Sequence, residues 1–200
     1  MGSSAWVRIG LVVIACGLSS DALACACCAD VGDRFVERVA IAQPEREIID
    51  AIRFASVAEV AIASGSPEDV EGIGFQSLPL RMKVERVGDE WTFTLDDLVG
   101  NIGRLFFTLP SSVTRFEVDP HDPMARDHAA GGIMLYKEWR LTTKAVGDGM
   151  LNGSVGGDQM ATLILHGRGS HCAMIADFNA WSLVLYGARA EVELFGSLDP

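Results

Sequence analysis

Three of the five cysteines in this chain lie within four residues, at Cys25, Cys27 and Cys28. A fourth, Cys172, lies near the other end of the chain and directly follows His171. In an oxidising compartment such thiols form disulfides, and neighbours in sequence pair with each other only under strain. We therefore predict a disulfide between Cys172 and one of the three N-terminal cysteines. It would close a loop of roughly 145 residues, which the loop-entropy description equates to about 4–5 kcal/mol of stability.

The same thiols offer an alternative, which is a metal centre. Thiolates select Cu(I) and Zn(II), and three cysteines together with His171 or Cys172 would complete a tetrahedral copper or zinc site. The spacing differs from the paired C-x-x-C pattern of zinc modules. The single C-x-x-C, from Cys25 to Cys28, lacks the strand and helix context of thioredoxin-like redox proteins. Both alternatives bring the two ends of the chain together, and the choice between them stays open.

A second group of residues able to do chemistry lies in a proline-containing segment. Two histidines and three carboxylates occur there within ten residues: Asp119, His121, Asp122, Asp127 and His128. Such a set could bind a divalent cation or carry out acid–base catalysis. Prolines and acids are also ordinary loop residues, so a solvated loop without chemistry is the competing interpretation.

The third candidate is the segment 167–172, Gly-Arg-Gly-Ser-His-Cys. Its glycines allow a ligand to approach the backbone, and the guanidinium of Arg168 can hold a carboxylate or a phosphate. We therefore predict a loop in which Arg168 and His171 bind a ligand. In the competing interpretation Arg168 pairs with an internal acid, and the glycines form a bulge beside a disulfide. The segment matches neither a P-loop nor a dinucleotide fingerprint.

Two further stretches carry polar residues. The segment 96–101 has oxygen ligands close to a turn but lacks the spacing of an EF-hand, so we predict a turn rather than a calcium site. In the strand expected around 133–142, Tyr136, Glu138 and Arg140 share one side, and Lys137 and Trp139 share the other with leucines. A charge on each side predicts that this strand lines a polar cavity or lies at a sheet edge.

The N-terminus has the pattern of a secretion signal. Arg8 precedes an apolar stretch at 9–18 that is too short to span a bilayer, and Ala22 and Ala24 supply small residues at a cleavage site. We therefore divide the chain into a signal peptide (1–24), a cysteine-rich N-terminal segment (25–33) and a single β domain (34–200). Cleavage after Ala26, which would remove Cys25, acylation of a cysteine as in lipoproteins, and an uncleaved tail are the alternatives.

Composition restricts the class of partner. The formal net charge is −11, which disfavours nucleic acid, because phosphates attract lysine and arginine. No later segment holds an apolar run long enough for a transmembrane helix. An apolar content of 49% is ample for a core without cysteine cross-links. The expected location is outside the cytoplasm, periplasmic or extracellular, with a lipid-anchored form as the alternative.

Hydrophobic alternation supplies the elements that must position these residues. Residues 78–95 alternate as a hairpin that turns at Gly88 and Asp89, and eight to eleven short strands are expected in all. We predict an all-β fold, an antiparallel β-sandwich or a closed β-barrel, with one short peripheral helix near 67–71. Over 45–64 two strands are favoured over a helix because β-branched residues dominate. Residues 146–159 are expected to form a loop or a loose hairpin.

These observations predict an exported β domain that binds a small ligand, a metal ion or a protein partner. Its cysteine-rich N-terminus is expected to be tied to the segment 167–172. A small exported hydrolase or isomerase that uses loop carboxylates and a histidine is one alternative. A lipid-anchored structural protein of the cell envelope is another. The sequence contains no nucleophile elbow, and no residue is assigned a catalytic role.

Overall fold

The computed structural model describes residues 34–64, 79–118, 135–152, 159–169, 178–186 and 191–199. These residues form eleven strands and one helix. In chain order they are β1 (Arg34–Ala40), α1 (Gln43–Ala51), β2 (Arg53–Phe54), β3 (Val57–Ser64), β4 (Leu80–Val87), β5 (Glu90–Asp96), β6 (Ile102–Thr108), β7 (Ser112–Val118), β8 (Leu135–Gly149), β9 (Gln159–Gly169), β10 (Phe178–Tyr186) and β11 (Glu191–Asp199).

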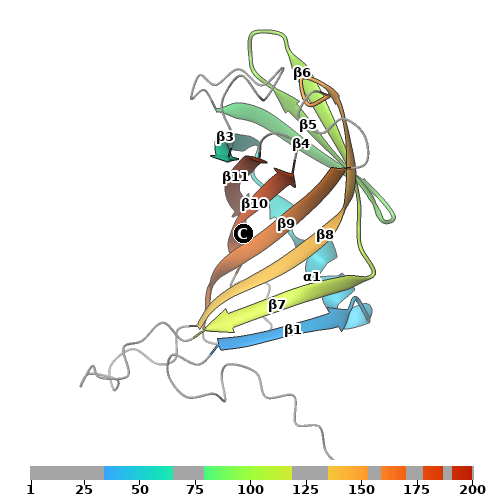
Figure 1. Ribbon diagram of the computed structural model, residues 1–200, viewed down its shortest axis with the longest axis vertical. Helices are drawn as coiled ribbons and strands as arrows, with labels where there is room; N and C mark the ends of the chain where they lie inside the picture. Colours follow the sequence, from blue (N-terminus) through green and yellow to red (C-terminus); the bar gives the residue numbers. More distant parts are fainter. Residues whose placement is uncertain are drawn as a thin grey trace, which may run out of the picture.

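Eight strands close into an antiparallel barrel (Figure 1). Their order is β8-β6-β5-β4-β3-β11-β10-β9, and β9 pairs back onto β8. The prediction of an all-β fold is confirmed, and of its two forms the structure is the barrel. The junction between β3 and β4 is the narrowest, since their register contains two residue pairs, Val57 with Arg81 and Ala58 with Leu80.

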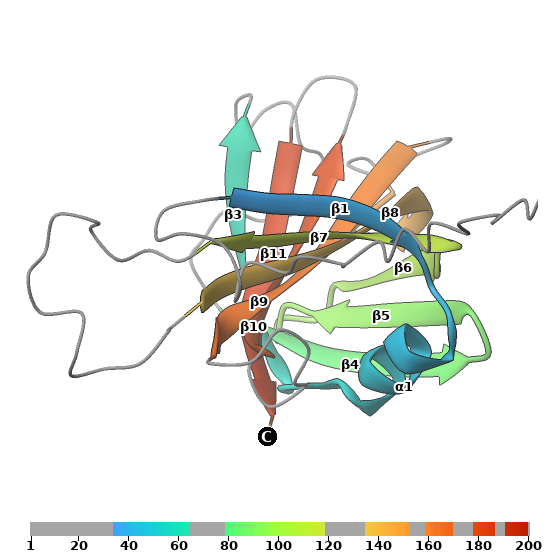
Figure 2. The ribbon, with the colours of Figure 1, turned by 90° about the horizontal axis from the view of Figure 1, so that it is seen from below.

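The long strand β8 carries two neighbours on one of its edges. Its first part pairs with β7, with Val118 opposite Tyr136, and its last part pairs with β6, with Gly103 opposite Gly149. Strand β9 occupies the other edge along most of its length. Strand β1 then pairs with β7, so β1 and β7 form a two-stranded extension of the barrel wall (Figure 2).

Side chains that alternate along the strands fill the barrel. The largest buried ones include Trp91, Trp139, Trp181, Phe93 and Phe107, each at most 1% exposed. An eight-stranded barrel has an interior just wide enough for side chains to fill, which agrees with this packed centre.

Helix α1 corrects the prediction of two strands over 45–64. Pro44 suits the first turn of a helix, and the side chain of Glu45 accepts a hydrogen bond of 3.0 Å from the backbone N–H of Ala42. Ile48 and Ile49 contact the core from one side of the helix. These signals outweigh the β propensity of the isoleucines. The second predicted strand is confirmed as β3, whereas the helix predicted near 67–71 lies outside the described residues.

Two other boundaries differ from the sequence prediction. Strand β8 continues through 146–149, where a loop or a loose hairpin was expected, because these residues pair with β6. It ends at Gly149, whose φ of +59° and close approach to the carbonyl of Ile102 leave no room for a side chain. Residues 167–169, also expected in a loop, belong to β9 because they pair with the start of β8.

The hairpin predicted over 78–95 is confirmed as β4 and β5.

In the part of the chain that the structure describes, no helix has the length and apolar character needed to cross a membrane.

Candidate functional site

Arg86, near the end of β4, holds the C-terminal end of α1. Its Nη1 donates to the carbonyl oxygens of Ile49 (3.3 Å) and Asp50 (3.2 Å), and its Nη2 donates to the carbonyl oxygen of Ile52 (3.0 Å). The last carbonyls of a helix have no partner within the helix, and they carry its negative dipole end. The guanidinium therefore caps α1 from a neighbouring strand.

Arg86 also lies over two aromatic rings. Its guanidinium carbon is 4.0 Å from the ring centroid of Trp91 and 5.4 Å from that of Phe54. Burial lowers the pKa of Arg86 to about 10, and the charge of Arg53 contributes in the same direction. The opposing influence of Asp50 is the smallest of the three. Burial, more than any neighbouring charge, therefore sets the electrostatic environment of Arg86.

Arg53, in β2, shares these acceptors. Its Nη1 donates to the carbonyl oxygens of Asp50 (2.8 Å) and Ile52 (2.9 Å), which Arg86 also contacts. Within the described ranges, Nε and Nη2 of Arg53 form no hydrogen bond, and neither arginine has a carboxylate within 4.0 Å. Arg53 and Arg86 thus share two uncharged backbone acceptors, and Nε and Nη2 of Arg53 are left without a hydrogen bond in the described residues.

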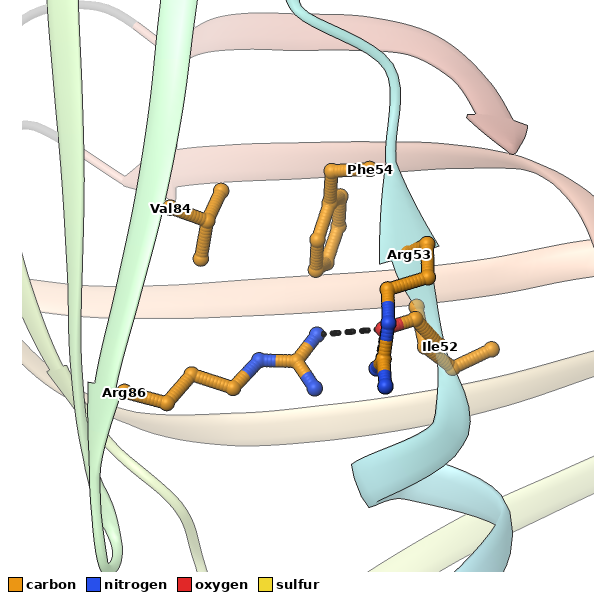
Figure 3. A pocket seen from close by; sticks show the side chains of 5 residues that line it. All are labelled: Ile52, Arg53, Phe54, Val84 and Arg86. Carbon is orange, nitrogen blue, oxygen red and sulfur yellow. Dashed lines mark hydrogen bonds between the residues drawn. The ribbon is translucent and has the colours of Figure 1, made fainter.

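A pocket of about 310 Å³ lies beside these two arginines (Figure 3). Its lining consists of Ile52, Arg53, Phe54, Val84 and Arg86. Figure 3 shows the two guanidinium groups facing each other below the ring of Phe54, with the apolar side chains around them. The volume lies at the lower end of the range of small-molecule sites, and the pocket is open to solvent.

The ring of Phe54 is held in a fixed orientation by the core. It makes edge-on contacts with Trp91, Phe93 and Trp181 at centroid distances of 6.1, 5.5 and 5.5 Å. Such contacts are a favoured arrangement of aromatic pairs. The apolar wall of the pocket is therefore rigid and continuous with the packed interior of the barrel.

A second charged region surrounds Arg115 on the inner side of β7. This guanidinium pairs with the carboxylates of Glu37 on β1 (3.3 Å) and Glu45 on α1, and it lies 5.0 Å from the ring centroid of Trp139. All three charged side chains are at most 21% exposed. Because Glu45 also accepts the N–H of Ala42, this network fixes the N-terminal end of α1.

Two more buried charges follow on the same inner side. Glu117 on β7 and Lys137 on β8 are opposite each other in the register and are 2% and 0% exposed. The ammonium of Lys137 lies 5.4 Å from the ring centroid of Phe178. The prediction that Lys137 and Trp139 share one side of this strand is confirmed, and the suggestion of a sheet edge is wrong, because β8 is paired on both edges.

The other side of β8 carries Tyr136, Glu138 and Arg140, as the sequence predicts. The hydroxyl of Tyr136 donates to Glu138 (2.5 Å), which also accepts from Arg140 (2.5 and 2.8 Å). Burial, followed by the contact with Glu138, raises the pKa of Tyr136 to about 12. Arg168, predicted to bind a ligand, is exposed, is opposite Tyr136 in the register and is not among the residues that line the Arg86 pocket.

The remaining predicted site residues lie outside the described residues. They are Cys25, Cys27, Cys28, Asp119, His121, Asp122, Asp127, His128, His171 and Cys172. Within the described ranges, no group of three or more histidine, cysteine, aspartate or glutamate side chains is arranged to hold a metal ion. The disulfide, the copper or zinc site and the acid–histidine loop therefore stay predictions.

The turn predicted at 96–101 is confirmed. The carboxylate of Asp96 accepts the N–H of Leu98 (2.8 Å), and that of Asp97 accepts the N–H groups of Val99 and Asn101 (both 3.0 Å). A hydrogen bond from the side-chain amide of Asn101 is the main cause that lowers the pKa of Asp97. The carboxylates thus serve the backbone of their own turn.

Sequence reasoning missed the Arg86 pocket, although a signal was present. In β4, Arg86 has the same parity as Leu80, Met82 and Val84, which face the barrel interior. A charged residue that continues an apolar alternation must find a partner inside the fold. Here the partner is the end of α1, which was predicted as a strand.

Searches of family models, of curated proteins and of solved structures found no match for this chain.

Proposed function

We propose that this protein is an exported, non-catalytic binding protein that holds a small ligand in the pocket between α1, β2 and β4. The observation that carries the proposal is the lining of this pocket. It combines a rigid apolar wall, formed by Ile52, Phe54 and Val84, with two arginines that lack carboxylate partners in the described residues. Binding sites characteristically combine an apolar surface with a few polar groups that orient the ligand.

The packing of the barrel supports a site at this position. The centre is filled by tryptophan and phenylalanine side chains, so the described interior offers a ligand less room than the mouth beside α1. Both ends of α1 are fixed by hydrogen-bonded arginines. A site built on fixed elements loses little freedom when it binds, which favours affinity.

The proposal keeps the N-terminal tie between a cysteine of 25–28 and Cys172. Arg34, Val118, Tyr136 and Arg168 are successive cross-strand partners. Three strand spacings separate the first from the last, which amounts to about 14 Å. The chain from Cys28 to Arg34 can extend over about 20 Å, so its length permits the bond. The intact mass of the exported protein, with and without reductant, tests the tie and reports acylation or a retained copper or zinc ion.

Nuclear magnetic resonance with isotope-labelled mature protein tests the binding site. We expect fragments from a panel of neutral, cationic and anionic compounds to shift amide signals of residues 52–54 and 84–86. Val84→Trp should fill the pocket and abolish these shifts. Val87→Trp is the matched control, because Val87 is 80% exposed and does not line the pocket. Shifts that persist in Val84→Trp, or no shifts with any fragment, would contradict the proposal.

A further inference from the structure

We infer that the ligand is a small organic anion, with one carboxylate bound to the free side of the Arg53 guanidinium, near Arg86, and an apolar body, about one aromatic ring in size, against Phe54 and Val84. This inference rests on the proposed function, since it names the chemical class that the same pocket selects. It follows from the charge, the free donors and the apolar wall of the pocket.

The charge argument comes from the partners of each arginine. Arg115 pairs with two carboxylates, whereas in the described part of the chain the hydrogen-bond acceptors of Arg53 and Arg86 are backbone carbonyls. Carbonyl oxygens accept hydrogen bonds but cannot cancel two positive charges. An anion bound to Arg53 beside Arg86 would supply negative charge and reduce the mutual repulsion of the two guanidinium groups. The local excess of positive charge at these two arginines contrasts with the net charge of the whole chain, which is −11.

The donor argument concerns Arg53. In the described part of the chain only its Nη1 is engaged, so Nε and one Nη remain available to an incoming group. These two positions form the side of a guanidinium that binds a carboxylate through two parallel hydrogen bonds. Figure 3 shows this guanidinium next to that of Arg86. A carboxylate would therefore receive a paired contact from one arginine and a long-range attraction from the other.

The shape argument separates an organic anion from an inorganic one. Three of the five lining residues are apolar, and Phe54 is fixed by three edge-on aromatic contacts. Phosphate or sulfate would use the arginines but leave this wall exposed to water. A neutral aromatic compound would cover the wall but leave the charges uncompensated. Only a ligand with both parts uses the whole lining.

Isothermal titration and amide-shift mapping with three probes test the inference. The probes are phenylacetate, its neutral counterpart 2-phenylethanol, and inorganic phosphate. We expect phenylacetate to bind at least ten-fold more tightly than either of the others, and to weaken as salt is raised. Arg53→Gln should reduce its affinity about ten-fold, because charge-assisted hydrogen bonds are lost. Arg81→Gln is the control, since Arg81 is an exposed arginine on the outer side of the same hairpin.

Each result distinguishes the ligand class from the proposed function. If 2-phenylethanol binds in the pocket as tightly as phenylacetate and Arg53→Gln has no effect, the anionic class is wrong while the binding function stands. If phosphate binds as tightly as phenylacetate, the requirement for an apolar body is wrong. If no probe shifts residues 52–54 and the fragment panel also fails, both proposals fall.

Discussion

Arg86 and Arg115 hold the two ends of α1 and lie in similar aromatic surroundings, but their hydrogen-bonding partners differ. Arg86 and Arg115 both lie over a core tryptophan, at 4.0 Å from Trp91 and 5.0 Å from Trp139. Arg115 fixes the N-terminal end of the helix through two carboxylates, and Arg86 fixes the C-terminal end through three carbonyls. The first cation is neutralised within the fold, while the second keeps its charge at the edge of a pocket.

The difference between Arg115 and Arg86 shows that the role of a charged residue inside an apolar barrel depends on its partners. Removing an ion from water is costly unless opposite charge and hydrogen bonds replace the water. Where the fold supplies that charge, as at Arg115, the residue serves stability. Where it supplies only neutral acceptors, as at Arg86, the residue can also attract a ligand. The partner set decides between the two roles, and the following variants test that distinction.

The largest effect is expected for Arg115→Met. It leaves Glu37 and Glu45 partly buried without their cation, and we expect the free energy of unfolding to fall by about 3 kcal/mol. Urea unfolding followed by tryptophan fluorescence measures this change. Arg104→Met is the control, because Arg104 pairs with Asp148 on the exposed surface and should change stability by less than about 0.5 kcal/mol. If both variants lowered the free energy of unfolding equally, the buried ion pairs of Arg115 would be no more important for stability than the exposed pair of Arg104.

Arg86→Met should have a smaller effect on stability. The lost hydrogen bonds to the end of α1 and the lost contact with Trp91 should lower the free energy of unfolding by about 1–2 kcal/mol. The last turn of α1 should exchange its amide hydrogens faster, while the N-terminal turn stays protected. Hydrogen exchange measured by nuclear magnetic resonance separates the two ends. Faster exchange along the whole helix would mean that Arg86 is not a local cap.

Double-mutant cycles should show coupling at one end of α1 only. We expect Arg115→Met and Glu45→Gln to interact by about 1 kcal/mol or more, since these side chains form a direct ion pair. Arg86→Met and Asp50→Asn should interact by less than about 0.5 kcal/mol, because Arg86 contacts the backbone carbonyl of Asp50. Urea unfolding of both sets supplies the values. Equal coupling energies would show that Arg86 has a carboxylate partner after all.

The smallest effect is expected at Asp97, whose carboxylate accepts from amide groups of its own turn in the described residues. Its pKa is lowered below 3.8 by the hydrogen bond from Asn101. A lowered pKa in the folded state means that the contribution to stability is present above pH 3.8 and is lost as the pH falls through the lowered value. The amide signal of Asn101 should titrate with a midpoint below 3.8. In Asn101→Ala that midpoint should rise.

Local patterns in the sequence predict the individual strands well. The hairpin of β4 and β5 follows from alternation and from Gly88, which adopts a φ of +61° at the turn. The two-sided character of the strand around Trp139 is predicted in the same way. These features depend on neighbours along the chain, so the sequence displays them directly.

Features that depend on distant partners could not be predicted. Closure of the barrel requires β8 to pair with both β6 and β9, and the sequence shows no register between segments so far apart. The pocket requires β4 to meet the end of α1, and residues 45–51 resemble a strand as much as a helix until that contact is known. Arg86 was visible as a charge in an apolar alternation, but its acceptors were not.

The narrow junction between β3 and β4 gives the barrel a preferred place to open. Only two residue pairs join these strands, and a barrel that breathes does so first where the fewest hydrogen bonds must break. Beyond that junction, the hydrogen bond from Arg86 to the carbonyl oxygen of Ile52 links β4 to the residue between α1 and β2. A ligand bound beside Arg86 would stabilise the closed barrel. Its presence would be recorded as slower opening of the whole barrel.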